Sequence, residues 1–374
     1  MNATDEERLA RVCLSRLGEP GDAPLGRLVA RVGAVGAVAS VRTGRVPPDL
    51  GITEEKVGGW QIRLPKTDPE ALLFVCEQFG GRFVCPGNAE WPTTLDDLGA
   101  RAPHGIWIRG AADLRHACLR SVALVGARAA TPYGLRVAAD LGAELADRAW
   151  TVVSGGALGI DAAGHRGALA ADGLTVAVLA NGIDSYYPPR NAELLAEIAR
   201  RGLLVSELPP GERPTQLRFI SRNRLIAALT RGTVVVEADL RSGANITAND
   251  ARKLNRKVMA VPGPVTSVMS RGCHRLLRAD SPATLVTSAP EIIEEAGLMG
   301  EGLEPQPRGP VLARDSLDLE SRQVLDAVPL RGGSVPAQVA VTAGVDINTA
   351  RSRIALLSAL GFIQKSAAGW TLKR

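Results

Sequence analysis

The chain has 374 residues, of which 45% are apolar and 22% are charged, as expected for a soluble globular protein of two or three domains. Aromatic residues make up only 3%, which argues against binding of single-stranded nucleic acid mainly by stacking of bases on aromatic rings. The five cysteines are scattered and form no C-x-x-C pair. A disulfide framework and a zinc site are therefore not expected. This use of cysteine favours the reducing cytoplasm as the location of the protein.

The first 48 residues carry apolar side chains at helical spacing, interrupted by glycine and proline. Glycine-broken helix pairs of this kind occur in helix-hairpin-helix and SAM-like modules. The acidic N-terminus does not resemble a secretion signal, and no segment is predicted to cross a membrane. A helix over 69–79 and short strands near 82–85 and 105–108 follow, so we assign 1–110 to a helical N-terminal domain with a connecting segment.

Strand and helix patterns alternate after residue 120. Continuous apolar runs separated by helices favour a parallel sheet covered on both faces. We therefore predict an extended Rossmann-like, doubly wound α/β domain over 111–298. Its strands are predicted at 121–126, 150–154, 174–180, 203–208, 233–238, 257–263 and 283–288.

The C-terminal part begins with a Pro/Gly-rich stretch over 299–314, which we interpret as a linker. Helices are predicted at 320–327, 335–343 and 347–360, and a hairpin around 367–369 follows. A helix-turn-helix with a hairpin is typical of a winged helix, which we assign to 315–374.

The first strand of the sheet ends in VGARAATPYG. A dinucleotide fold has G-x-G-x-x-G at this place, but here Gly126 is followed by Arg128, and Thr131-Pro132 begin a helix. A G-x-x-x-x-G-K-[ST] loop is also missing from the sequence. NAD and P-loop nucleotide chemistry are disfavoured, and no cofactor is expected.

The second strand leads into SGGALGIDAAGHRGAL, whose glycines allow a tight loop with backbone N–H groups near an anion. Asp161 and His165 lie one helical turn apart. They are either an acid/base or metal pair, or a capping aspartate and a packed histidine. We favour the structural interpretation because no third ligand or nucleophile follows at a suitable spacing, so no metal is expected.

The segment Phe219–Thr247 combines an arginine-rich helix, a buried strand and a small-residue loop that opens another helix. Helix starts beside the end of a hydrophobic strand bind phosphate in α/β sheets. From residue 213 to 257 there are ten Lys and Arg against three Asp and Glu, a net +7, whereas the whole chain carries +5. This local excess favours a polyanion over a merely solvated helix face.

Two glutamates follow neighbouring strands. Glu207 and Glu237 are candidates either for catalytic carboxylates or for ion-pair partners of Arg222 and Arg224. We favour ion pairing because a dense arginine cluster needs anions nearby.

Six motifs occur in order: SGGALGIDAAGHRGAL, AVLANGIDSYYPPRN, LLVSELPPGERP, FISRNRLIAAL, VVVEADLRSGANITANDA and VMAVPGPVTSVMSRGCHRLL. Together they resemble the DprA/Smf family of DNA-processing proteins over about residues 70–300. The resemblance implies a dimeric recombination mediator without established catalytic activity. Such a protein binds and protects incoming single-stranded DNA in natural transformation and loads the RecA recombinase. Its sheet would carry a basic DNA groove in place of the usual nucleotide pocket.

The resemblance also implies site residues. Arg128, Arg222, Arg224, Ser242 and Gly243 would face phosphate. The predicted DNA-binding set further includes Ser154, Gly155, Arg166, Arg218, Asn223 and Thr247. The predicted dimer contact comprises His274, Leu276, Leu277 and Leu285.

The chain departs from the family pattern at several positions. Leu158 stands where the family commonly has a basic residue, which puts that lobe of the groove in doubt. His274 replaces an asparagine, and Asn245 stands in an apolar place.

Two alternatives to a non-enzymatic single-stranded DNA mediator remain open. Related folds hydrolyse nucleotide phosphoribosides with a P-G-G-x-G-T-x-x-E loop, of which this chain has only Val261-Pro262-Gly263-Pro264. A regulator that reads duplex DNA through the winged helix would use Arg351, Arg353 and Lys365. Against that, most of the charge excess lies in the sheet domain.

Overall fold

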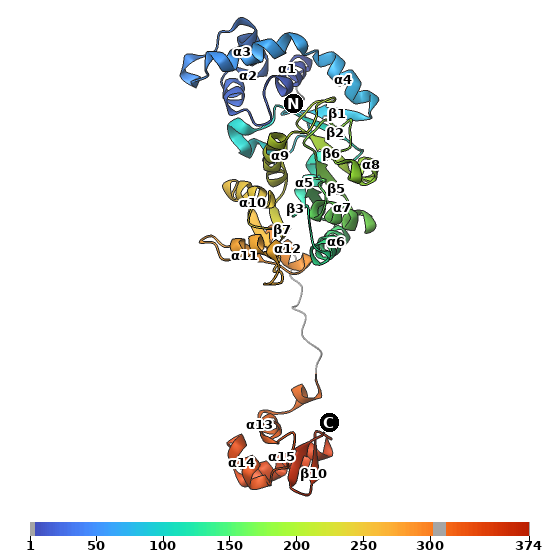
Figure 1. Cartoon of the computed structure of the whole chain (residues 1–374), viewed down its shortest axis with the longest axis vertical. Coiled ribbons are helices and arrows are strands. Elements are labelled where there is room, and N and C mark those ends of the chain that lie inside the picture. The colour runs from blue at the N-terminus through green and yellow to red at the C-terminus, as the bar shows by residue number, and fades with distance from the viewer. Residues whose placement is uncertain (1–3, 302–311, 374) are drawn as a thin grey trace. The chain divides into compact units, whose positions relative to one another are not determined.

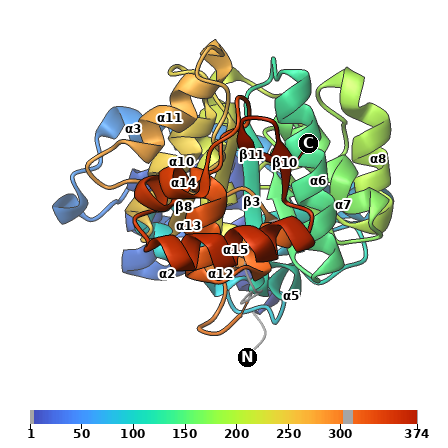
Figure 2. The same ribbon diagram turned by 90° about the horizontal axis from the view of Figure 1, so that it is seen from below.

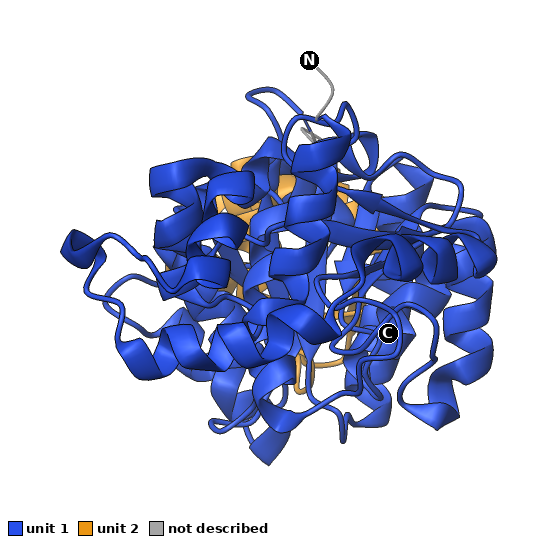
Figure 3. Cartoon of the chain, turned by 90° about the horizontal axis from the view of Figure 1, so that it is seen from above, with its two compact units in different colours: residues 1–303 blue, residues 304–374 orange. Residues whose placement is uncertain are grey.

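The computed structural model describes residues 4–301 and 312–373. The chain divides into two compact units, residues 1–303 and 304–374 (Figure 3). Each unit has a hydrophobic core of its own. The predicted linker, 299–314, spans this division, and its residues 302–311 lie outside the described part of the chain.

The first unit opens with four α-helices. The first three pack around Leu14, Leu28 and Trp60, and the fourth contributes Leu72 and Cys76 to a separate cluster with Phe83 and Trp107. Each of these helices begins at a Thr or Asp whose side chain accepts a hydrogen bond from a backbone N–H of the first turn, which stabilises the helix start. Their bounds are α1 Asp5–Leu17, α2 Ala23–Thr43, α3 Glu54–Arg63 and α4 Pro69–Gln78.

By length and composition alone, helix α2 is apolar enough to cross a membrane. No segment of this kind was predicted from the sequence. Its backbone is non-helical at Gly33, with φ 75° and ψ 171°. This break divides it into two stretches, each much shorter than the roughly 20 residues that a span needs. Leu25, Leu28 and Val41 of α2 are buried in the core of the helical region.

The described residues form a nine-stranded sheet in the order β1-β2-β6-β5-β4-β3-β7-β8-β9. Strands β3 to β9 run parallel, whereas β2 pairs antiparallel with both β1 and β6. The sheet is thus mostly parallel, as predicted, but it also takes in two strands that the predicted boundary at residue 110 left outside. The bounds are β1 Gly81–Val84, β2 Ile106–Arg109, β3 Ser121–Gly126, β4 Thr151–Ser154, β5 Thr175–Val178, β6 Leu203–Ser206, β7 Gly232–Glu237, β8 Lys257–Ala260 and β9 Thr284–Leu285.

Helices cover both faces of the sheet. In β3, Val122 and Leu124 pack with α6, α7 and α12, whereas Ala123 and Val125 pack with α5, α9, α10 and α11. Helix α8 joins the first face beside α7. Because both faces are buried, the strands read as continuous apolar runs. The bounds are α5 Leu114–Leu119, α6 Pro132–Asp147, α7 Ile160–Ala170, α8 Ala192–Arg201, α9 Gln216–Leu229, α10 Ala244–Lys253, α11 Arg271–Leu277 and α12 Ala289–Ala296.

The direction of strand addition reverses beside β3. The chain proceeds from β3 through β4 and β5 to β6, and then returns to place β7 on the opposite side of β3. Figure 1 shows α1 to α4 gathered at the β1 end of this sheet. In sheets of this kind, ligands bind at the carboxyl ends of the strands where the order reverses. The fold therefore directs attention to the ends of β3 and β7.

In its described residues, 312–373, the second unit has three α-helices and a hairpin, at the positions that the sequence predicted (Figure 2). Val324, Ile354 and Leu357 form its centre. Gly344, at φ 68°, ends the second helix in the left-handed conformation that favours glycine. The bounds are α13 Leu319–Ala327, α14 Pro336–Ala343, α15 Ile347–Ala359, β10 Ile363–Ser366 and β11 Gly369–Leu372.

Candidate nucleic-acid interface

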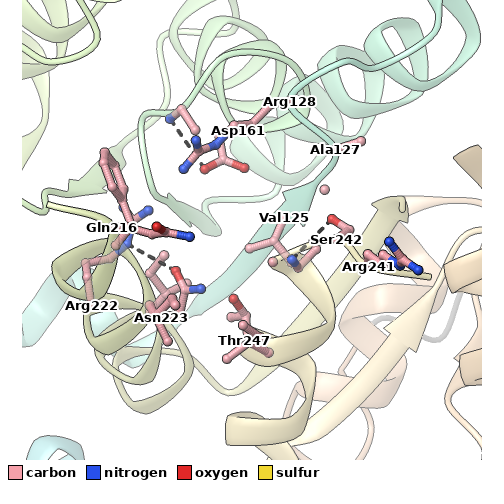
Figure 4. A pocket seen from close by; sticks show the side chains of 18 of the residues that line it. Val125, Ala127, Arg128, Asp161, Gln216, Arg222, Asn223, Arg241, Ser242 and Thr247 are labelled. Carbon is pink, nitrogen blue, oxygen red and sulfur yellow. Dashed lines mark hydrogen bonds between the residues drawn. The ribbon is translucent and has the colours of Figure 1, made fainter. Parts of the chain in front are cut away.

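A cavity of about 760 Å³ lies at the reversal point of the sheet. One wall is the loop after β3 with Asp161 of α7, a second is the start of α9, and a third is the start of α10 (Figure 4). Of the predicted phosphate-binding residues, six line this cavity: Arg128, Arg222, Asn223, Ser242, Gly243 and Thr247.

Two exposed arginines supply positive charge to the cavity. Arg128 follows β3, and Arg241 follows β7. Within the described residues, neither forms an ion pair with a carboxylate. Sequence reasoning missed Arg241, although it stands directly before the SGAN segment at the end of a predicted strand.

Two aromatic rings also lie at the cavity. The rings of Tyr187 and Phe219 are 5.8 Å apart between centroids and tilted by 47°. The Arg128 guanidinium carbon lies 4.9 Å from the Phe219 centroid, within the range of a cation–π contact. The low aromatic content argues against binding mainly by stacking, but the fold brings together two rings that are distant in sequence.

The start of α10 presents backbone N–H groups to the cavity. Its N-cap is Gly243, at φ −60° and ψ −21°, and no side chain caps the helix. The Ala244 N–H donates only to Ser242 Oγ, at 3.3 Å. In the part of the chain that the structure describes, no carboxylate accepts a hydrogen bond from Gly243 or Ala244. A helix start of this kind attracts anions.

Arg222 reaches the cavity but is 5% exposed. Its Nη1 donates to the carbonyl oxygens of Gly155, at 2.7 Å, and of Val178, and its Nε donates to Asn223 Oδ1. Burial lowers the pKa of Arg222 to about 10, while the nearby Asp161 opposes that shift. Arg222 thus ties the loop after β4 to the end of β5, and its phosphate contact stays a prediction.

Asp161 holds the glycine-rich loop after β4. Its Oδ2 accepts hydrogen bonds from Gly155 N, at 3.0 Å, and from Ala157 N, at 3.4 Å. Burial raises the pKa of Asp161, and Arg222 and these N–H groups oppose the rise. The anion bound by this loop is thus the protein's own carboxylate.

Arg224 is fully buried and does not line the cavity. Its Nη2 donates to Glu207 Oε1 at 2.8 Å, and its Nε donates to the Arg101 carbonyl. Glu207 Oε1 also accepts a hydrogen bond from Gly21 N, in the turn between α1 and α2. The predicted ion pair of Glu207 is confirmed. The donors of Arg224 join the helical region to the sheet, so this structure places its predicted phosphate contact away from the cavity.

Glu237 forms no ion pair with either arginine, contrary to prediction. Its carboxylate oxygens accept hydrogen bonds from Thr131 N, at 2.8 Å, and from Thr131 Oγ1, at 2.7 Å. Thr131 is the N-cap of α6. In a dinucleotide-binding fold the pyrophosphate lies at this helix start, so here a buried carboxylate of the chain takes its place.

Four other predicted phosphate contacts lie away from the cavity. Ser154 is buried and donates to the Leu124 carbonyl, and Gly155 is buried beside Arg222. Arg166 is exposed on α7 but is not part of the cavity wall. Arg218 donates to Glu19 and Glu212 in a separate hollow.

His165 is a packed core residue, as the structural interpretation predicted. Its Nδ1 lies 2.7 Å from Thr175 Oγ1, which itself donates to the Val152 carbonyl, so His165 donates and Thr175 accepts. Burial lowers the pKa of His165 to about 3. Among the described residues there is no group of three His, Cys, Asp or Glu that could hold a metal ion.

The residues predicted at a dimer contact differ in accessibility. Leu276 belongs to the core of its own protomer, and Leu277 packs against that core, so Leu276 is not free for a partner. His274 Nε2 lies 3.0 Å from the Gly263 carbonyl. Leu285 is 52% exposed on β9, the edge strand of the sheet.

Comparison with known proteins shows relatives of the whole chain and of its sheet domain. The family model for DNA recombination-mediator protein A matches residues 82–297. A putative DNA processing protein DprA of Mycobacterium tuberculosis is 45% identical over 371 residues, which cover 96% of this chain and 93% of the relative. The protein Smf of Escherichia coli is 37% identical over 259 residues, covering 69% and 68%.

Solved structures agree with the sequence relatives. The X-ray structure of DprA from Streptococcus pneumoniae has a TM-score of 0.65 at 29% identity and covers 79% of this chain and 99% of that one. DNA processing protein A from Helicobacter pylori, described for its single-stranded DNA binding mode, has a TM-score of 0.51 at 30% identity, covering 57% and 94%. The chain therefore belongs to the DprA/Smf family of DNA recombination-mediator proteins.

Proposed function

We propose that this protein is a recombination mediator that binds single-stranded DNA in the cavity at the reversal point of the sheet. One observation carries the proposal. Backbone N–H groups after β3, after β4 and in the α1–α2 turn each donate to a carboxylate of the chain: Glu237, Asp161 and Glu207. Within the described residues, no carboxylate takes that place at the start of α10, which therefore remains for an external phosphate.

The cavity suggests how a strand lies in it. Phosphates would approach the α10 start, whose cavity also contains Arg128 and Arg241. Bases would face the rings of Phe219 and Tyr187, which line the same cavity. Stacking on aromatic rings requires unpaired bases, whereas contacts to phosphate do not depend on sequence. The single-stranded DNA binding described for the Helicobacter pylori relative supports this arrangement.

Further parts of the proposal rest on family membership. The protein would protect incoming DNA and load RecA in natural transformation or related recombination, in the cytoplasm. It would act as a homodimer, and the exposed Leu285 on the edge strand β9 is the contact residue that remains available. The helices and hairpin of the second unit would form a winged helix.

We also propose that the protein acts without catalysis. A phosphoriboside hydrolase needs a carboxylate free to act on its substrate, and Glu207 and Glu237 are both buried and hydrogen-bonded elsewhere. Two carboxylates line the cavity, and each accepts backbone hydrogen bonds. Asp161 holds the loop after β4, and Asp239 Oδ1 accepts from Leu240 N at 2.7 Å.

The test is a double variant, Arg128→Ser with Arg241→Ser. Both side chains are exposed, so the fold should be kept. Loss of two phosphate contacts should lower affinity for oligothymidylate by about tenfold and reduce the slope of log K against log salt by about 1.4. Fluorescence anisotropy over a salt series measures both. The matched control is Arg136→Ser with Arg231→Ser, which changes two arginines outside the cavity wall; an equal loss in the control would contradict the assignment.

A further inference from the structure

A second hollow, of about 220 Å³, lies between the N-terminal helices and the loop that joins β6 to α9. The hydrogen bonds from Arg218 of α9 to Glu19, which follows α1, show that these segments distant in sequence meet here. Its charged lining consists of Arg16, Arg63, Lys66 and Arg218 with Glu19 and Glu212.

Positive charge exceeds negative charge in this hollow. Both carboxylates accept hydrogen bonds from Arg218, at 2.9 Å for Glu19 and 2.8 Å for Glu212. Arg16 is exposed and lies 3.8 Å from Glu212, too far for a hydrogen bond. Lys66 is exposed and has no ion pair with any described carboxylate. Arg218 engages both acids, and Arg63 donates to the Leu17 carbonyl at 2.6 Å. Arg16, held only by the long ion pair to Glu212, and Lys66 are therefore the cations that remain for an external anion.

The loop between β6 and α9 links this hollow to the main cavity. Pro214 and Thr215 line the cavity, whereas Pro209 and Glu212 line the second hollow. Arg213 lies between them in sequence, and its side chain is exposed. A polyanion that leaves the cavity over Thr215 would therefore pass Arg213 and reach Lys66 and Arg16.

We propose that the second hollow continues the binding path for the backbone of single-stranded DNA, so that the N-terminal helices contribute phosphate contacts of their own. This inference rests on the proposed function of the main cavity. A flexible backbone tracked by a positively charged groove is the usual way in which long single strands are held without sequence preference. The contact should therefore depend on the length of the strand and on salt.

The experiment uses the full chain and two oligothymidylates, one of about six and one of about twenty nucleotides, because single-strand grooves have site sizes of about 4–16 nucleotides. The short one can fill only part of an extended path, and the long one can fill all of it. The variant is Arg16→Ser with Lys66→Ser, at two exposed side chains. Its matched control is Arg136→Ser with Lys253→Ser, which also removes one arginine and one lysine in weak ion pairs, with Asp140 and Asp250, outside both hollows.

We expect the Arg16/Lys66 variant to bind the long oligonucleotide about tenfold more weakly, with a salt slope lower by about 1.4 for two lost phosphates. Its affinity for the short oligonucleotide should equal that of the wild type. If the variant bound the long oligonucleotide as tightly as the wild type does, or lost equal affinity for both lengths, the proposed binding path through the second hollow would be contradicted. If the wild type bound neither length, the proposed function itself would fail, which separates the two conclusions.

Discussion

The buried imidazole of His165 makes the stability of the sheet domain sensitive to pH. Its pKa is about 3 in the folded protein, against an ordinary value of 6.5, because burial disfavours the charged ring. Between these values the unfolded chain binds a proton that the folded chain does not. The free energy of unfolding should therefore fall as the pH drops below 6.5, approaching a slope of about 1.4 kcal/mol per pH unit.

The variant His165→Asn tests this at the residue scale. An asparagine amide can donate to Thr175 Oγ1 in place of Nδ1 but does not titrate. Urea unfolding between about pH 7 and pH 5 should show a shallower pH slope in the variant than in the wild type, whatever its overall loss of stability. Identical slopes would show that His165 does not carry this dependence.

Residue type alone did not predict which arginines reach the cavity. Arg222 and Arg224 are two positions apart, and side chains at that spacing on a helix point to different sides. One therefore faces the cavity, and the other enters the contact with Glu207 and Arg101. Both arginines of the RNR motif were predicted to contact phosphate, as if they lay on one surface. In the structure Arg222 and Arg224 point to opposite sides of α9.

At the scale of elements, the start of α10 differs from the other helix and loop starts around the cavity. A Cβ added at Gly243 would meet no atom within 4 Å, and the backbone there is right-handed. A Cβ added at Gly155 would lie 2.3 Å from Arg222 Nη1. Packing thus requires a glycine at position 155, whereas position 243 has room for a larger side chain.

Gly243→Ala should therefore keep or raise stability, by up to about 1 kcal/mol, since alanine restricts the unfolded chain. Its methyl group would obstruct the close approach of phosphate to the helix start, so affinity for oligothymidylate should fall several-fold. Thermal unfolding and fluorescence anisotropy measure the two effects, and Gly155→Ala should show loss of stability instead. Unchanged DNA affinity in folded Gly243→Ala would show that phosphate does not approach α10.

The elements themselves were largely predictable. Strands β3 to β8 read as apolar runs because both faces of the sheet are buried, and helix caps such as Thr131 mark where helices begin. The antiparallel addition of β1 and β2 was not predictable, because β2 pairs with β6, about 95 residues later in the chain, and an apolar pattern does not show which strands pair. The anion sites filled by Glu237 and Asp161 depend on contacts between distant segments, which spacing alone does not reveal.

At the scale of the molecule, the two units separate the sheet from the helices and hairpin of the C-terminal part. In the second unit, Arg353 is engaged by Asp318 and Glu320, which leaves the exposed Arg351 and Lys365 as its available cations among the three considered for duplex reading. The cavity in the first unit offers free arginines, an uncapped helix start and aromatic rings together. We therefore assign the main nucleic-acid contact to the first unit.

The most direct test of this account compares the affinity of the wild-type chain for a labelled oligothymidylate and for the corresponding duplex, by fluorescence anisotropy over a salt series. The account predicts tighter binding of the single strand at every salt concentration, with affinity that falls steeply as salt rises, because phosphates meet cations while unpaired bases meet Phe219 and Tyr187. Equal or tighter binding of the duplex would contradict the assignment of the cavity as a single-stranded DNA site.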